Sequence, residues 1–227
     1  MKAVILAAGK GERLKATVDD IPKPMIEYKG KPVLQHNVEL CARFGIRELF
    51  INTHHLPHVI KNYFGDGRTF GVKIEYSFEE TLLGTAGELN NVREQLSDGP
   101  FFVLYGDNCS DFDLGSLEKE FQTHGCIGVI GFHYREDVSQ SGVGEFASDG
   151  RITRFVEKPV SGVTACHWVN AGVCCLFPRE DHGSRIYGDA CRLASTRFGN
   201  GTPRFYHNTR VSSNGGRRDE FFGDFRG

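Results

Sequence analysis

Short apolar runs alternate with helix-length amphipathic segments from the start of this chain, and that alternation constrains its fold more than any other feature. Repeated strand–helix units of this kind favour a mainly parallel sheet with helices on its faces. The spacing predicts strands at residues 2–7, 49–51, 72–76, 101–105 and 126–133, and helices at 32–44, 58–64, 86–96 and 114–124. The sequence therefore predicts an α/β fold.

Residues 142–156 interrupt this rhythm with two strand-like runs around the turn Ser148-Asp149-Gly150, which is typical of a β-hairpin and makes the expected sheet mixed. The composition changes again near the end, because residues 181–227 contain 8 of the 17 arginines and no lysine. A chain of 227 residues suits one domain with a sizeable core. We therefore expect a single domain over residues 1–180 and a divergent tail over 181–227, in which no core element is expected.

Charge and composition exclude several function classes. The formal net charge of −2 gives no overall field that would attract nucleic acid or an anionic membrane. No apolar run approaches the roughly 18 to 20 residues of a spanning helix, and the first apolar run leads into a glycine loop instead of a cleavage site. The seven cysteines and nine histidines show neither disulfide-framework nor zinc-site spacing. We expect a cytoplasmic protein without nucleic-acid or membrane partners, and a homo-oligomer stays open.

The glycine loop follows the first predicted strand, at the end of the strand where open α/β sheets bind ligands. Gly9 and Gly11 let backbone N–H groups approach an anion closely, because no Cβ stands in the way. Neither common nucleotide loop fits, because Leu14 stands where a dinucleotide loop needs glycine and no Gly-Lys-Ser/Thr of a P-loop follows. A polyphosphate is the expected ligand, with a structural turn as the alternative. The side chains that add positive charge are Lys10, Arg13, Lys15 and Lys23.

This loop and the segments after it carry a family resemblance. Residues 6–14, followed by Ile21-Pro22-Lys23-Pro24-Met25 and Gly30-Lys31-Pro32-Val33-Leu34, resemble the start of sugar-1-phosphate nucleotidyltransferases. Pro22 and Pro24 fix φ on both sides of Lys23, which holds its ammonium group near the loop. The resemblance implies one Rossmann-like, GT-A-like domain, catalytic roles for Arg13 and Lys23, and nucleotide binding by Leu6, Ala7, Ala8, Gly9, Lys10 and Gly11.

Two further segments fit the nucleotide side of such a site. Leu83-Gly84-Thr85-Ala86-Gly87 opens a predicted helix, and its glycines would let a planar base pack against backbone. This run resembles the family's base-recognition loop, and its sequence is most similar to that of mannose-1-phosphate guanylyltransferases. The alternative to a base-binding role is that Thr85 simply caps the helix. Asp107 ends a buried strand in a carboxylate, and the resemblance makes it the Mg²⁺ ligand. Asp111 and Asp113 are expected to be loop or helix-cap residues. The base-binding set is Gly84, Thr85, Ala86 and Gly87.

Three later segments resemble the family's acceptor-sugar side: Gly142-Val143-Gly144-Glu145, Val156-Glu157-Lys158-Pro159 and Asn170-Ala171-Gly172-Val173. Lys158 can neutralise a sugar phosphate, Glu157 can accept hydrogen bonds from hydroxyls, and Asn170 can both donate and accept. Glycines would let backbone approach the sugar ring. The sugar-phosphate set is therefore Gly144, Glu157, Lys158 and Asn170.

The resemblance implies that a sugar 1-phosphate attacks the α-phosphorus of a nucleoside triphosphate in line and releases pyrophosphate, with no protein nucleophile. GTP and mannose 1-phosphate are the expected substrates. Thymidylyl, uridylyl or cytidylyl transfer to another sugar or alcohol phosphate stays open, as does a catalytically weak, nucleotide-sugar-binding regulatory subunit. The last alternative rests on the tail, because the family's second metal carboxylate has no counterpart after residue 180, and the surroundings of Asp219 and Asp224 do not match it.

Overall fold

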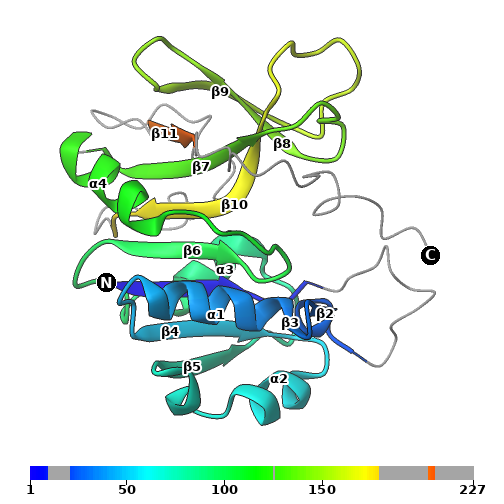
Figure 1. Cartoon of the computed structure of the whole chain (residues 1–227), viewed down its shortest axis with the longest axis vertical. Coiled ribbons are helices and arrows are strands. Elements are labelled where there is room, and N and C mark those ends of the chain that lie inside the picture. The colour runs from blue at the N-terminus through cyan, green and yellow to red at the C-terminus, as the bar shows by residue number, and fades with distance from the viewer. Residues whose placement is uncertain (10–20, 125, 179–203, 208–227) are drawn as a thin grey trace.

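A computed structural model of the chain describes residues 1–9, 21–124, 126–178 and 204–207. Within these residues nine strands form one mixed sheet (Figure 1). Its main path runs β11 (Arg204–His207), β7 (Gly128–Tyr134), β10 (Trp168–Leu176), β6 (Phe101–Tyr105), β1 (Lys2–Leu6), β4 (Glu48–Thr53) and β5 (Lys73–Phe78). The hairpin β8 (Gly142–Phe146) and β9 (Ile152–Glu157) branches from β10.

The strands β6, β1, β4 and β5 are parallel neighbours, whereas β10 runs antiparallel to both β6 and β7. A mixed sheet with a parallel core confirms the expected fold class. The hairpin around Gly150 is also confirmed, since β8 pairs antiparallel with β9. β11 pairs parallel with β7, although it lies in the tail where no core element was expected.

Helices cover both faces of the sheet, and the alternation of side chains along β1 shows why (Figure 1). Ala3 and Ile5 point into one apolar cluster with Leu34, whereas Val4 points into the opposite cluster with Leu89. No helix among these residues is long and apolar enough to cross a lipid bilayer. The first face carries α1 (Val33–Arg43), α2 (Pro57–Phe64) and α4 (Leu114–His124), and the second carries α3 (Gly84–Asn91).

Short elements complete the structure around the site. The two-stranded ribbon β2 (Glu27–Tyr28) and β3 (Lys31–Pro32) precedes α1, and the 3-10 turns are η2 (Lys23–Met25) and η3 (Arg68–Phe70). The bounds of β6 and α4 match the sequence prediction, and most other bounds differ by one or two residues.

The helix expected at 86–96 is wrong at its end. α3 stops at Asn91, because Asn90 and Asn91 are poor helix formers, and the chain continues in turns to the buried Leu96. The strand β10 was not expected at all, since glycine and two adjacent cysteines interrupt any alternation along it.

Candidate active site

Four neighbouring strands bring the predicted site segments to one edge of the sheet (Figure 1). β6 leads to Asp107, β1 leads to the phosphate loop and β5 leads to the base loop, while Asn52, the last residue but one of β4, lies between the last two. The carboxyl ends of parallel strands meet at one edge of a sheet, and open α/β sheets bind their ligands there. Strand order therefore gathers groups that lie far apart in the sequence.

The described part of the phosphate loop is tied to the neighbouring strand. Ala7 and Ala8 are buried, and their backbone N–H groups donate to Oδ1 of Asn52 at 2.6 and 3.3 Å. Gly9 is exposed, and the space that a Cβ would occupy there is open. Since Asn52 takes the first two N–H groups, an anion would meet the loop from Gly9 onward. Lys10, Gly11 and Arg13 lie outside the described residues.

Lys23 and Asp107 form an ion pair that the sequence analysis did not foresee. Nζ of Lys23 donates to Oδ2 of Asp107 at 2.5 Å, and the two side chains are 39% and 34% exposed. The turn η2 holds Lys23 in place, with Met25 N donating to the backbone oxygen of Pro22 at 2.7 Å. A partly exposed pair of this kind is open to exchange its partner for a ligand, because solvent screens its attraction.

The turn that carries Asp107 is fixed from two sides. Gly106 N donates to the backbone oxygen of Leu6 at 2.8 Å, and a Cβ on Gly106 would stand 2.8 Å from the same oxygen, so glycine is required. Asn37 is buried on α1 and donates Nδ2 to the backbone oxygen of Asn108 at 2.8 Å. The carboxylate therefore has a set position relative to the phosphate loop.

Asp107 fits a magnesium ion that is held partly by substrate. Mg²⁺ is usually bound through one or two carboxylates together with substrate phosphates and water. Within the part of the chain that the structure describes, no three His, Cys, Asp or Glu side chains gather, so no cage made by protein alone is present there. Asp113 instead caps α4, accepting from Ser116 N at 3.0 Å, in line with the expectation for it. Asp219 and Asp224 lie outside the described residues.

The base loop forms the first turn of α3, which contains Gly84, Thr85, Ala86 and Gly87. Gly84 has φ of 70°, and a Cβ on Gly87 would stand 2.3 Å from Cβ of Leu83, so both positions require glycine. Thr85 does not cap the helix, because the N-cap position is Leu83 and no side-chain cap bond forms. Leu83 N instead donates to Oε2 of Glu79 at 2.8 Å.

Two buried carboxyl groups lie beneath this loop, and sequence reasoning missed both. Glu79 is 2% exposed and accepts from Nδ2 of Asn52 at 2.7 Å, while Glu88 is 0% exposed and hydrogen-bonded to the Ser77 hydroxyl. Burial raises the pKa of Glu88 to about 7, and the nearby charge of Glu79 acts in the same direction. Oε2 of Glu88 accepts no hydrogen bond among the described residues.

The predicted acceptor residues Glu157 and Lys158 lie at the end of β9. Lys158 has φ of 45°, a left-handed conformation that is unfavourable for a residue other than glycine, and its N–H donates to the backbone oxygen of Ser141 at 3.0 Å. The Glu157 carboxylate lies over Gly142, where a Cβ would stand 2.8 Å from Oε2. Backbone strain of this kind is often found at ligand sites.

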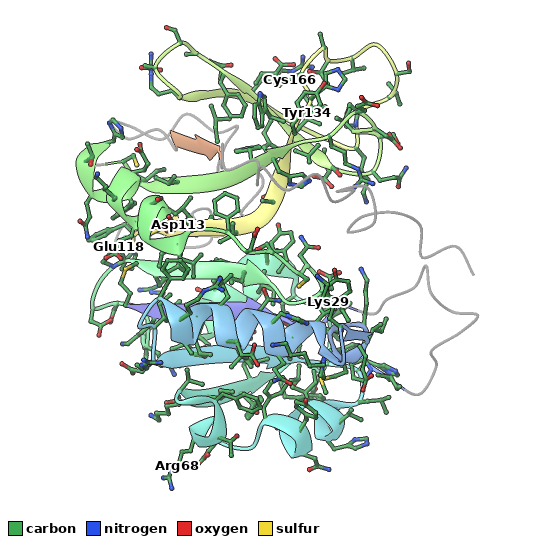
Figure 2. All side chains as sticks on the ribbon, viewed as in Figure 1. Lys29, Arg68, Asp113, Glu118, Tyr134 and Cys166 are labelled. Carbon is green, nitrogen blue, oxygen red and sulfur yellow. The ribbon has the colours of Figure 1, made fainter. Side chains whose placement is uncertain are left out.

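The two glycines on the acceptor side make close contacts within the protein. A Cβ on Gly144 would meet the Phe132 ring at 2.7 Å, and Cys166, at the β8–β9 end of the molecule (Figure 2), donates its thiol to the backbone oxygen of Gly144 at 2.8 Å. Gly144 therefore accommodates aromatic packing. Gly172 has φ of 71° in a bulge of β10. Its N–H donates to Oδ1 of Asn170 at 2.9 Å.

A model of one protein family matches residues 2–178, with the description "Nucleotidyl transferase". The chain belongs to the nucleotidyl transferase family. One similar protein is the UTP–glucose-1-phosphate uridylyltransferase of Synechocystis, 38% identical over 191 residues. The catalytic subunit beta of mannose-1-phosphate guanylyltransferase from Danio rerio is 38% identical over 182 residues.

These alignments cover 78% of this chain but 49% and 50% of the two relatives, so the chain spans about half the length of the curated relatives it matches. The crystal structure of HddC from Yersinia pseudotuberculosis complexed with GMP-PN superposes with a TM-score of 0.74 and 24% identity, covering 91% of this chain and 90% of that one. At 24% identity, this superposition shows that the two proteins share a fold.

Proposed function

We propose that this family member transfers a nucleotidyl group from a nucleoside triphosphate to a sugar 1-phosphate. The observation that carries the proposal is the Lys23–Asp107 pair, whose carboxylate lies on the turn tied to the phosphate loop. A cation and a metal-binding carboxylate at that point suit a reaction that builds up negative charge on phosphate oxygens. The base loop at the same edge of the sheet suits the other end of a nucleotide.

In this reaction an oxygen of the sugar phosphate forms a bond to the α-phosphorus while the bond to the β-phosphate oxygen breaks, and pyrophosphate leaves with the electron pair. Mg²⁺ held by Asp107 would neutralise phosphate charge. Lys23 would move from the carboxylate to the phosphates, an exchange that its partial exposure allows. Arg13 is proposed to supply a second cation, and the acceptor would be oriented by Glu157, Lys158 and Asn170.

GTP and mannose 1-phosphate are the proposed substrates, because the sequence of the base loop is most similar to that of mannose-1-phosphate guanylyltransferases. Relatives named for guanylyl and for uridylyl transfer are equally identical to this chain, so transfer of uridylyl, thymidylyl or cytidylyl groups is the alternative. A weak regulatory subunit that binds nucleotide sugars is the second alternative, because the family's second metal carboxylate has no counterpart in the sequence after residue 180.

Pyrophosphate release over a grid of four triphosphates and several sugar 1-phosphates tests the proposal. Asp107→Asn should lower the rate by about 100-fold or more, because a charged metal ligand is lost. Asp113→Asn is the matched control, since asparagine caps a helix as well as aspartate does and its rate should stay unchanged. Nucleotide binding without pyrophosphate release in any combination would favour the regulatory reading instead.

A further inference from the structure

We propose that Asn52 and Glu79 are positioning residues that hold the phosphate loop and the base loop at a fixed separation. The inference rests on the proposed function in one respect, because it takes both loops to bind a single nucleotide. It adds residues that lie outside both loops and that belong to none of the predicted sets. Their contacts, burial and chemical complementarity carry the argument.

The two side chains form an unbroken chain of hydrogen bonds between the loops. Oδ1 of Asn52 accepts from Ala7 and Ala8, at 2.6 and 3.3 Å, and Nδ2 of the same side chain donates to Oε1 of Glu79 at 2.7 Å. Oε2 of Glu79 then accepts from Leu83 N at 2.8 Å, directly before α3. Every polar atom of both side chains thus contacts a loop or the partner side chain.

Backbone contacts hold Glu79 from the sheet side. The N–H of Glu79 donates to the backbone oxygen of Thr53 at 2.9 Å, and the backbone oxygen of Glu79 accepts from Nδ1 of His54 at 2.7 Å. Asn52 is 3% and Glu79 is 2% exposed. A buried carboxylate is unfavourable unless hydrogen bonds compensate for its lost hydration, so apolar residues would fill this position at lower cost if packing were its only task.

The pattern of donors and acceptors makes the link specific. Glu79 must accept at both oxygens, and Asn52 must accept at one atom and donate at the other. Glu79→Gln keeps the volume but brings an NH₂ group against another donor. Asn52→Asp brings a second carboxylate against the first. The double variant Asn52→Asp/Glu79→Gln reverses the central bond and restores each donor–acceptor pair of the link between the loops at the same net charge.

Binding of GTP, UTP and tripolyphosphate to the full chain, measured by calorimetry, tests this role. We expect Glu79→Gln to weaken GTP or UTP binding about tenfold, the scale of one broken buried hydrogen bond. Tripolyphosphate has no base to contact the base loop, so its affinity should change by less than about twofold. The double variant should recover most of the nucleotide affinity, as a double-mutant cycle reveals for coupled residues.

Thr53→Val is the matched control for simple loss of stability. Its hydroxyl donates to the backbone oxygen of Ser77 at 3.0 Å and to neither loop, so its removal should leave nucleotide affinity unchanged. The positioning role is overturned if nucleotide and tripolyphosphate affinities fall together, if folded Glu79→Gln binds nucleotide normally, or if the double variant fails to recover.

The outcomes also separate this inference from the proposed function. The positioning role is supported and transfer is contradicted if the wild-type chain binds triphosphates but releases no pyrophosphate, while the Asn52 and Glu79 variants change nucleotide binding as expected. Pyrophosphate release that is insensitive to the Asn52 and Glu79 variants contradicts the positioning role alone. A wild-type chain that binds no triphosphate overturns both.

Discussion

Glu88→Gln should change how the stability of this protein depends on pH. Glu88 is fully buried on α3, where its carboxyl bonds to the Ser77 hydroxyl and lies near Glu79. Burial is the main reason that its pKa is raised from the ordinary 4.5 to about 7. The folded chain therefore binds a proton at this site over a range of pH in which the unfolded chain has released it.

The sign and size of the effect follow from that difference. The proton stabilises the fold fully below about pH 4.5, and this contribution is lost as the pH rises through about 7. At roughly 1.4 kcal/mol for each pKa unit, the loss amounts to about 3 kcal/mol by pH 8. Glutamine resembles the protonated carboxyl in size and charge, so Glu88→Gln should not show this loss.

Urea unfolding of both proteins at pH 5, 6, 7 and 8 measures the effect. The free energy of unfolding of the variant, relative to wild type, should rise by about 2–3 kcal/mol from pH 5 to pH 8, because at pH 5 the unfolded chain has not yet released all of this proton. Titrating groups that do not interact with Glu88 are common to both proteins and cancel in the difference. Glu94→Gln, an exposed residue just after α3, is the control and should give a nearly flat difference. A flat or falling difference for Glu88→Gln would refute the argument that burial holds the proton.

Three further variants test other parts of the site. Gly172→Ala should lower the free energy of unfolding, measured by thermal denaturation, by about 1–3 kcal/mol, because φ is 71° and an amide nitrogen stands 2.5 Å from the new Cβ. Gly162→Ala is the control and should lose less, since its positive φ is surrounded by open space. Equal losses in the two variants would contradict the role of this contact. Asn37→Leu should raise the Mg²⁺ concentration for half-maximal pyrophosphate release roughly tenfold, because the turn that carries Asp107 loses a buried donor, and an unchanged requirement would count against it. Lys23→Met should reduce the rate of pyrophosphate release about 100-fold or more. Its Mg²⁺ affinity, measured by calorimetry, should not fall, because Asp107 loses a competing cation. Weaker Mg²⁺ binding would contradict the exchange proposed for the pair.

The parallel core could be predicted from sequence because short apolar runs alternate clearly there with segments of helical periodicity. Buried runs such as β6 and a strongly amphipathic helix such as α4 carry their own local signal, and their bounds were predicted correctly. The same rhythm predicted that strand ends, and hence Asp107 and the phosphate loop, would share an edge. Residues 10–20 and the tail after residue 207 lie outside this comparison.

Buried polar partners could not be predicted in the same way. Asn52 and Glu79 are ordinary polar residues at two strand ends, and only the parallel register that sets Asn52 beside Ser77 brings them together. One local signal did exist, since Asn52 directly follows a fully apolar stretch of β4, where a polar side chain must find a buried partner. Which partner it finds depends on pairing between strands, and sequence spacing does not encode that.

The antiparallel strand β10 explains why a mixed sheet suits the proposed reaction. If β10 ran parallel to β6, its carboxyl end would lie at the edge of the sheet that carries the site. Asn170, which is near the start of β10, would then lie toward the opposite edge. Because β10 is reversed, the bulge after Asn170 lies against the turn after β6, where a Cβ on Gly172 would meet Asn108. The proposed acceptor strand therefore reaches the carboxylate turn through a reversal of direction, with glycine at the point of closest approach. For the proposed reaction, this arrangement would bring the acceptor and the nucleotide to the same edge of the sheet.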